Sequence, residues 1–361
     1  MHRIAVIGGD GIGPEVVAQG LKVLEAVSKI HPFGYSLTTY PFGAEHYLAT
    51  GEIMPEGILD ELRAHAAIYL GALGDPRLTP GLIEAGIVGA IRWDLDMYVN
   101  LRPIILYNEN LTPLKDKRPE DIDMVVVREN TEDVYTGVGG FFKKGTPDEV
   151  ATQQMTFTRK GVERVIRYAF ELTRKRNRRK KLTLVDKANA VRAFDLWRRV
   201  FTEVGSEYPD VERETVYVDA MAMFMVKNPE AFDVVVTSNM FGDIITDLGA
   251  MLQGGMGIAA SGNIHPGQVS MFEPIHGSSP KYAKTNQANP IGAILALSMM
   301  LDFLGEHAAG AAVERSVAAL LGSGRICDVS AQSGLGTDTV GDMVVAEMAR
   351  QASPQAAGQR A

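Results

Sequence analysis

Apolar and polar positions along the chain follow two spacings. Short runs of apolar and β-branched residues, bounded by glycine, proline or polar residues, are typical of buried strands. Longer segments carry apolar residues every three or four positions, which is typical of helices with one buried face. The predicted strands are residues 3–7, 35–40, 67–70, 104–106, 124–128, 182–185, 215–219 and 232–236.

The predicted helices lie among and after these strands. They cover residues 14–29, 55–63, 86–98, 160–173, 290–304 and 308–321. Because strands and helices alternate, we expect an α/β protein with a layered, parallel or mixed sheet. Glycines and an extended polar stretch at residues 137–158 predict a protruding hairpin, and the Ala/Gln/Gly-rich end at 353–361 is expected to fray.

The turn between the first strand and the first helix is rich in glycine and reads Gly8-Gly-Asp-Gly-Ile-Gly-Pro14. Its glycines are spaced G-x-G-x-G, whereas the dinucleotide fingerprint of the Rossmann fold requires G-x-G-x-x-G. The dinucleotide fingerprint of the Rossmann fold is therefore absent from this turn.

Composition narrows the class of protein. A chain of 361 residues, 46% of them hydrophobic, can form two domains with ample cores. The net charge of -8 argues against a general nucleic-acid surface, and the basic run at 174–181 is explained as a solvated helix end. The single cysteine, Cys327, excludes an intrachain disulfide and fits a reducing compartment. No segment approaches the roughly 18 apolar residues needed to cross a bilayer, so we expect a soluble, cytoplasmic protein.

Three aspartates are candidate metal ligands. Asp243 and Asp247 stand four residues apart in a segment with helical spacing, so their carboxylates share one face and repel each other unless a cation lies between them. Asp219 ends the predicted strand at 215–219. Oxygen ligands of this kind suit Mg²⁺ or Mn²⁺.

Basic residues at the ends of predicted elements are candidate substrate ligands. Arg92, Arg102 and Arg128 would suit a substrate with more than one carboxylate, because a planar guanidinium binds a carboxylate through two hydrogen bonds. Lys187 follows the predicted strand at 182–185, and the carboxyl ends of parallel strands are where α/β enzymes place working residues.

Several motifs together resemble the β-decarboxylating dehydrogenase family, which includes the isocitrate and isopropylmalate dehydrogenases. The resemblance extends over nearly the whole chain and is closest to the members that act on 3-isopropylmalate. The motifs are Gly9-Asp-Gly-Ile-Gly-Pro-Glu15, Asn100-Leu-Arg-Pro103, Val185-Asp-Lys-Ala-Asn189, Val218-Asp-Ala-Met-Ala-Met223, Asn239-Met-Phe-Gly-Asp-Ile-Ile-Thr-Asp247, Met271-Phe-Glu-Pro-Ile-His-Gly-Ser278 and Arg325-Ile-Cys-Asp328.

The resemblance implies an isopropylmalate dehydrogenase-like fold, which has two α/β domains with a parallel or mixed sheet and is not a Rossmann fold. A large discontinuous domain on the cofactor side would comprise residues 1–99 and 253–361, and a small central domain, 100–252, would carry a protruding arm and the dimer interface. Family members are homodimers with shared active sites, so Lys187 and Asp219 would face the partner's Asp243 and Asp247.

The resemblance also implies a role for each candidate residue. Lys187 and Tyr135 would be the catalytic proton-transfer pair. Arg92, Arg102, Arg128, Val88 and Asp219 would contact substrate, and Asp219, Asp243 and Asp247 would bind Mg²⁺ or Mn²⁺. NAD would contact His276, Gly277, Ser278, Ser279, Lys281, Tyr282 and Asn289. The expected reaction is the oxidative decarboxylation of (2R,3S)-3-isopropylmalate to 2-oxoisocaproate and CO2, a step of leucine biosynthesis.

Two departures from the family pattern leave alternatives open. Ile87-Val88-Gly89 stands where isopropylmalate enzymes usually present two leucines, so tartrate, D-malate, homoisocitrate or isocitrate are alternative substrates. Lys281-Tyr282 replaces an aspartate of NAD-specific members and would also suit the 2′-phosphate of NADP. A non-catalytic regulatory subunit is the alternative of a different class, and the intact set of catalytic and metal-binding residues argues against it.

Overall fold

The computed structural model describes residues 1–353, which form two compact units. The first unit comprises Met1–Met97, Ile105–Pro119 and the described residues from Ala250 onward, and the second comprises Tyr98–Ile104 and Glu120–Gly249. Residues 105–119 thus belong to the first unit, whereas the predicted central domain included them. The predicted fraying at 353–361 lies, apart from Ser353, outside the described residues.

The first unit contains a mixed sheet in the order β2-β1-β3-β12-β11. Its strands are β1 (His2–Gly9), β2 (Tyr35–Tyr40), β3 (Ala67–Ala72), β11 (Ala260–Ile264) and β12 (Ser270–Pro274). All neighbouring strands run parallel except β11 and β12, which are antiparallel. β1 and β3, which have parallel neighbours on both sides, are nearly continuous apolar runs because both faces of such a strand are buried.

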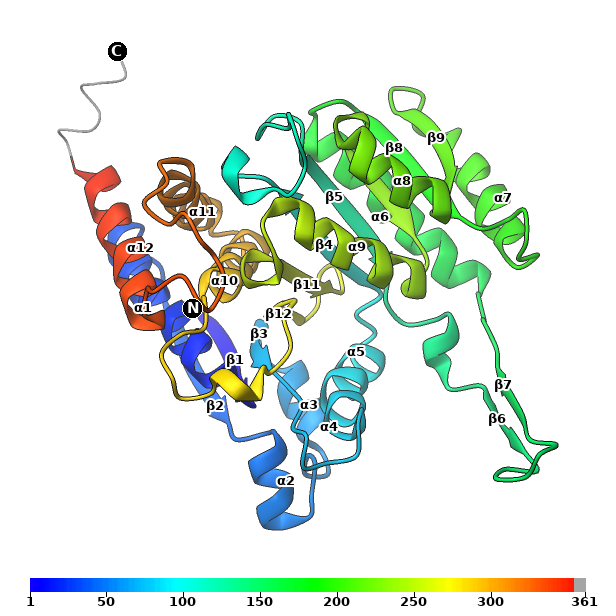
Figure 1. The fold of residues 1–361 in the computed structure, drawn as a ribbon, viewed down its shortest axis with the longest axis horizontal. Helices are drawn as coiled ribbons and strands as arrows, with labels where there is room; N and C mark the ends of the chain where they lie inside the picture. The colour runs from blue at the N-terminus through cyan, green and yellow to red at the C-terminus, as the bar shows by residue number, and fades with distance from the viewer. Residues whose placement is uncertain (354–361) are drawn as a thin grey trace. The chain divides into compact units, whose positions relative to one another are not determined.

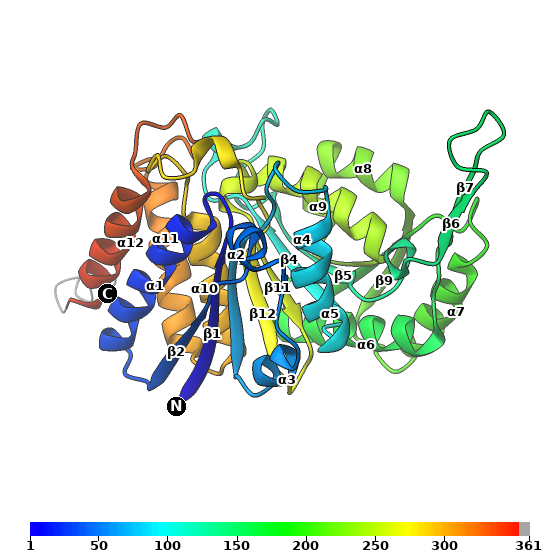
Figure 2. The same ribbon diagram turned by 90° about the horizontal axis from the view of Figure 1, so that it is seen from below.

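Each face of this sheet is covered by its own set of helices. Ile4 and Val6 of β1 pack with one set, whereas the alternate residues Ala5 and Ile7 pack with the other, as the two-residue period of a strand requires. The first set gathers along one side of the strands in Figure 2 and consists of α1 (Gly13–Ile30), α10 (Ile291–Phe303), α11 (His307–Gly322) and α12 (Thr337–Ala352). The second set includes α3 (Ile58–Arg63), α4 (Leu82–Glu84) and α5 (Ala90–Asp94).

The remaining elements of the first unit are short. They are α2 (Ala44–Thr50), a π-helical segment at Ala85–Gly89, and 3-10 turns at Glu109–Leu111, Met256–Ile258 and Pro280–Tyr282. The predicted helix at 86–98 is therefore wrong in its extent: helical structure runs from α4 through the π-helical segment and ends at Asp94. The residues after Asp94 leave the helix through Asp96, which has a positive φ of 49°.

The second unit contains a sheet in the order β4-β5-β10-β8-β9. Its strands are β4 (Val99–Ile105, whose last residue belongs to the first unit), β5 (Asp123–Glu129), β8 (Lys181–Asp186), β9 (Glu212–Tyr217) and β10 (Val234–Thr237). β5, β10, β8 and β9 are parallel. The helices are α6 (Arg159–Arg176), α7 (Phe194–Gly205), α8 (Val218–Lys227) and α9 (Asn239–Gln253, which continues into the first unit), with 3-10 turns at Val134–Thr136 and Pro229–Ala231.

A two-stranded hairpin, which we call the arm, protrudes from the second unit (Figure 1). It is formed by β6 (Gly139–Phe142) and the antiparallel β7 (Val150–Gln153), so the hairpin predicted at 137–158 is confirmed. Two residues lie elsewhere than predicted. Asp219 is in the first turn of α8, because β9 already ends at Tyr217, and Arg102 is inside β4 rather than at a strand entry. No helix of residues 1–353 is long and apolar enough to cross a membrane.

Candidate active site

Two buried arginines converge on one aspartate in the second unit. Arg128 near the end of β5 is 3% exposed and donates through its Nη1 to Asp243. Arg102 of β4 is 5% exposed, and its Nη1 lies 3.3 Å from the same carboxylate. Buried guanidinium groups are costly unless they are paired, and here Asp243 supplies the opposite charge.

Neighbouring polar side chains fix the two guanidinium groups. The Nε and Nη2 of Arg128 donate to Asn239 Oδ1 at 2.9 and 2.7 Å. Arg102 donates from Nε to Asn100 Oδ1 and from Nη1 to Thr246 Oγ1, both at 2.6 Å. The two arginines are therefore held in one orientation, which favours bidentate recognition of an anion.

Tyr135 lies beside this pair. It is carried by the 3-10 turn at 134–136, its hydroxyl donates to Asp243 Oδ2 at 3.2 Å, and the Cζ of Arg128 lies 5.6 Å from the centre of its ring. Partial burial and the negative charge of Asp243 raise the pKa of Tyr135, and the positive charge of Arg128 partly offsets them. The phenol is therefore a proton donor at neutral pH.

Asp243 and Asp247 lie one turn apart on α9, as their spacing predicted. Burial and the negative charge of Asp243 raise the pKa of Asp247, and the arginines Arg102 and Arg128 partly offset this. Such repulsion between two carboxylates is what a bound cation relieves, and a set of oxygen ligands suits Mg²⁺ or Mn²⁺. Within residues 1–353, however, no three His, Cys, Asp or Glu side chains lie close enough to hold a metal ion.

The third aspartate belongs to a separate cluster. Asp219 is exposed, and its Oδ1 accepts a hydrogen bond of 2.5 Å from the Nζ of Lys187, which directly follows β8. This hydrogen bond, more than any other contact, lowers the pKa of Asp219. The structure thus pairs Lys187 with Asp219, and Asp243 with Tyr135 and the two arginines, but it does not gather all three aspartates within one chain.

In the first unit, Arg92 is held by a side chain that the sequence did not single out. Arg92 Nη2 donates to Glu273 Oε1 at 2.9 Å, and the same oxygen accepts from Asn263 Nδ2 at 2.7 Å. The Nε of Arg92 is buried and has no hydrogen-bond partner among residues 1–353. Val88 is half-buried in the π-helical segment, a type of irregularity that often marks functional sites.

The predicted cofactor residues lie on the segment after β12, also in the first unit. His276 is buried and its Nδ1 lies 3.1 Å from the Gly277 carbonyl; burial lowers its pKa. Lys281 is exposed, and its Nζ lies 4.7 Å from the centre of the Tyr282 ring. Asn289 Oδ1 accepts from the N–H of Ile291, the first residue of α10, at 3.0 Å.

The glycine turn at 8–13 packs against this segment. Ile12 N donates to the Ser278 carbonyl at 2.8 Å, and a Cβ on Gly11, whose φ is +56°, would lie 2.0 Å from that oxygen. Gly11 therefore allows close backbone contact and a left-handed conformation. The glycines of this turn therefore serve close packing against the backbone at Ser278, a role that does not require the dinucleotide fingerprint.

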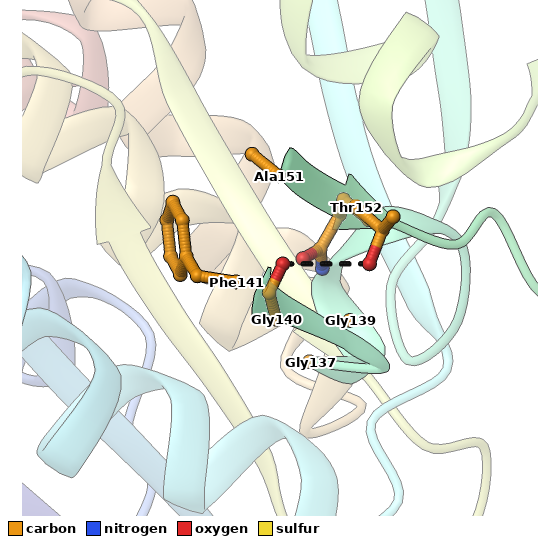
Figure 3. Close-up of a pocket in the computed structure, with 7 residues that line it drawn as sticks. Gly137, Gly139, Gly140, Phe141, Ala151 and Thr152 are labelled. Atoms are coloured by element: carbon orange, nitrogen blue, oxygen red, sulfur yellow. Dashed lines mark hydrogen bonds between the residues drawn. The ribbon is translucent and has the colours of Figure 1, made fainter. Parts of the chain in front are cut away.

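The arm carries an exposed hollow (Figure 3). It is lined by the glycines of β6 and the preceding turn, together with Phe141, Ala151, Thr152 and Gln153. The Oγ1 of Thr152 donates to the Gly140 carbonyl across the hairpin at 3.4 Å. The hollow has no titratable side chain in its lining, so it offers a contact surface and no acid-base chemistry.

Comparison with known proteins identifies the family whose sequences this chain resembles. The sequence profile of the isocitrate/isopropylmalate dehydrogenase family matches residues 3–344. The chain is 54% identical to the 3-isopropylmalate dehydrogenase of Thermobifida fusca, with 88% of this chain and 90% of that protein covered. It is 48% identical to the 3-isopropylmalate dehydrogenase of Nocardia farcinica, with 95% and 99% covered.

Solved structures agree with these sequence matches. The crystal structure of isocitrate dehydrogenase from Methylococcus capsulatus matches with a TM-score of 0.87 at 36% identity, covering 96% of this chain and 99% of that one. The apo form of a β-decarboxylating dehydrogenase from Thermococcus kodakarensis matches with a TM-score of 0.79 at 33% identity, covering 99% and 98%.

Proposed function

Because this chain belongs to the isocitrate/isopropylmalate dehydrogenase family, we propose that it oxidises and decarboxylates 3-isopropylmalate, with hydride transfer to NAD, as a step of leucine biosynthesis in the cytoplasm. The observation that carries the choice of substrate is the 54% identity to an enzyme of that name over most of both chains. The isocitrate dehydrogenase from Methylococcus capsulatus is 36% identical, a lower identity that favours the isopropyl substrate.

The arginines are proposed to bind the malate part of the substrate. Arg102 and Arg128 are buried and fixed by Asn100, Thr246 and Asn239, so little rotamer entropy is lost when they bind a carboxylate. Arg92, held by Glu273, is proposed as the third guanidinium. Val88 is proposed to contact the C3 substituent.

Asp243 and Asp247, with Asp219 from the partner subunit of a homodimer, are proposed to hold the divalent metal ion. Their oxygens fit Mg²⁺ or Mn²⁺. Burial and, after it, the negative charge of Asp243 raise the pKa of Asp247, and a cation would relieve the repulsion between the two carboxylates. When bound, such an ion polarises the C2 oxygen of the substrate and stabilises negative charge on it.

Lys187 and Tyr135 are proposed to move the two protons of the reaction. Lys187 takes the proton of the C2 hydroxyl while the hydride leaves C2, which oxidises the alcohol to a ketone. Loss of the β-carboxylate as CO2 leaves its electron pair in an enolate. Tyr135, a phenol with a raised pKa, then donates its proton to C3.

NAD is proposed to bind the segment that includes His276 to Ser279, Lys281, Tyr282 and Asn289. Gly277 is exposed, and a Cβ at that position would meet nothing within 4 Å, so the backbone there is open to a ligand. Lys281 is exposed and could also meet a 2′-phosphate, which makes NADP the alternative cofactor. NAD is proposed first because most isopropylmalate dehydrogenases use it.

The homodimer is proposed from two sets of exposed apolar side chains in the second unit. α8 and α9 expose Met223, Phe224, Val226 and Ile244, and the arm exposes Phe141 and Phe142. Exposed apolar side chains that gather in such number favour an interface. Lys187 and Asp219 would then complete the partner's site.

Product analysis tests the proposed reaction. The purified enzyme is incubated with 3-isopropylmalate, NAD and Mg²⁺ or Mn²⁺, and NADH, CO2 and 2-oxoisocaproate are quantified. We expect the three products in equal amounts, and loss of activity on chelation of the metal. Lys187→Met is the negative control, with Lys115→Met, an exposed lysine outside the site, as its matched control. NADH without CO2 would contradict the decarboxylation.

A further inference from the structure

Asp133 is a buried acidic residue two positions before Tyr135. Its relative exposure is 0%, yet its backbone adopts φ 73° and ψ −147°, a combination that side-chain-bearing residues rarely adopt. Backbone strain of this kind persists only where the surrounding contacts impose it. The sequence did not single out Asp133, because one aspartate in an acidic loop carries no distinctive pattern.

The two carboxylate oxygens of Asp133 join two elements of the candidate site. Oδ1 accepts from Val134 N at 2.8 Å, at the start of the 3-10 turn that carries Tyr135. Oδ2 accepts from Met240 N at 3.0 Å, in the first turn of α9, which carries Asp243. The first N–H groups of a helix lack partners within it and favour a negative charge, so this carboxylate suits the position.

The backbone of Asp133 is anchored from a third direction. Asp133 N donates to the Thr156 carbonyl at 2.9 Å, and Thr156 N donates back to the Asp133 carbonyl at 3.4 Å. Thr156 follows the returning strand of the arm. The backbone contacts hold Asp133 in its strained conformation, and the carboxylate contacts then fix the Tyr135 turn against α9.

We propose that Asp133 is a positioning residue, whose carboxylate sets the 3.2 Å separation between the Tyr135 hydroxyl and the Asp243 carboxylate. This inference rests on the proposed function, in which Tyr135 donates a proton to C3. Asp133 does not touch the reacting atoms and acts through Tyr135. Removal of its carboxylate should therefore slow turnover while leaving substrate binding by Arg102 and Arg128 intact.

A double-mutant cycle tests this coupling. Asp133→Asn, Tyr135→Phe and the double variant are compared with the wild type, using 3-isopropylmalate, NAD and Mg²⁺. Asparagine keeps the size of the side chain but replaces one acceptor oxygen with an N–H donor. We expect Asp133→Asn to lower kcat about tenfold and to change the KM for the hydroxy acid by less than about twofold. The double variant should turn over at the rate of Tyr135→Phe, within about twofold.

A second variant separates positioning from folding. Asp133→Gly adopts the observed backbone conformation without strain but removes both acceptor oxygens. We expect it to show the same loss of kcat at unchanged KM, even if its thermal stability equals that of the wild type. Asp210→Asn makes the same carboxylate-to-amide change at an exposed residue paired with Arg174 and should leave kcat and KM unchanged.

Two results would overturn the inference, and they are distinguishable. If the losses in the double variant multiply, or if the Asp133 variants turn over at the wild-type rate, Asp133 does not act through Tyr135 although the proposed reaction stands. If Tyr135→Phe alone is as fast as the wild type, the proposed role of Tyr135 is wrong as well, and the single variant reveals it.

Discussion

Glu129 illustrates how burial at a single residue changes the chemistry of a carboxyl group. It is fully buried next to Arg128 and accepts hydrogen bonds from Thr131 N, Thr131 Oγ1 and Glu132 N at 2.7, 2.8 and 2.9 Å. These donors favour the charged form, but burial outweighs them and raises the pKa of Glu129 to about 7. The group therefore ties stability to pH near neutrality.

The raised pKa predicts a defined pH window. Below the ordinary carboxyl pKa of 4.5 both the folded and the unfolded chain hold the proton. As pH rises from 4.5 to about 7, the unfolded chain releases it first, so this contribution to stability is lost across that window and stays lost above it. Glu129→Gln removes the titration. The unfolding free energy of the variant minus that of the wild type should increase by at most about 3 kcal/mol from pH 4.5 to 7.

Denaturant unfolding at a series of pH values measures this difference. Glu56→Gln, the same replacement at an exposed residue, is the control. If the difference in unfolding free energy between Glu129→Gln and the wild type is the same at every pH from 4.5 to 7, Glu129 does not titrate in this range.

The relative positions of two site residues could be predicted from the sequence where the residues lie only a few positions apart. The face shared by Asp243 and Asp247 follows from helical periodicity alone. The partners of the arginines could not be predicted, because Asn239 and Asp243 are more than a hundred residues from Arg128 in sequence. Only the parallel pairing of β5 with β10 brings Arg128 to the start of α9.

At the scale of elements, the arm has little packing of its own. Phe141 and Phe142 are 62% and 66% exposed, and a two-stranded hairpin is at best marginally stable by itself. An exposed apolar hairpin of this kind is expected to be covered in the working protein. The proposed dimer supplies that cover.

Replacement of both phenylalanines tests the role of the arm. Burial of each ring contributes about 1.5 to 3 kcal/mol, so the Phe141→Ser/Phe142→Ser variant should raise the dimer dissociation constant by about 100-fold or more. Sedimentation velocity over a dilution series measures it. Leu37→Ser, at an exposed apolar residue of β2, is the matched control. An unchanged dissociation constant would mean that the arm does not contribute to the interface.

The strands were predicted more reliably than the helices. All eight predicted strands exist, and most of them are continuous apolar or β-branched runs, as buried parallel strands are, but β11 and β12 were not predicted. α12 was missed because its buried large apolar residues, Val340, Val344 and Met348, stand among glycine, alanine and polar residues. The π-helical segment at 85–89 could not be predicted, since its irregularity depends on packing within the first unit.

At the scale of the whole molecule, the candidate catalytic and metal-binding residues of one chain form two separate groups. Lys187 pairs with Asp219, while Asp243 pairs with Tyr135 and the arginines. No sequence pattern shows whether two such groups of residues form one site within a chain or across two subunits. Only the family resemblance led to the prediction that a partner subunit supplies Lys187 and Asp219.

Subunit complementation tests that division. Lys187→Met and Asp247→Asn should each abolish activity. In the proposed dimer each site takes Lys187 from one subunit and Asp247 from the other, and the twofold axis makes the two sites equivalent. A mixed dimer would therefore contain one site with both changes and one intact site. A 1:1 mixture refolded together should therefore regain about one quarter of wild-type activity, since about half of its dimers are mixed. Absence of any recovery would place Lys187 and Asp247 in the same chain's site.

The substrate itself is tested most directly by the ratio of kcat/KM values. The enzyme is assayed with 3-isopropylmalate, isocitrate, homoisocitrate, tartrate and D-malate, each with NAD and with NADP. We expect 3-isopropylmalate with NAD to exceed every other combination by about tenfold or more, the discrimination that a few methylene contacts provide. A higher kcat/KM for any of the other acids would contradict the proposed substrate, and a higher value with NADP would assign Lys281 to the 2′-phosphate.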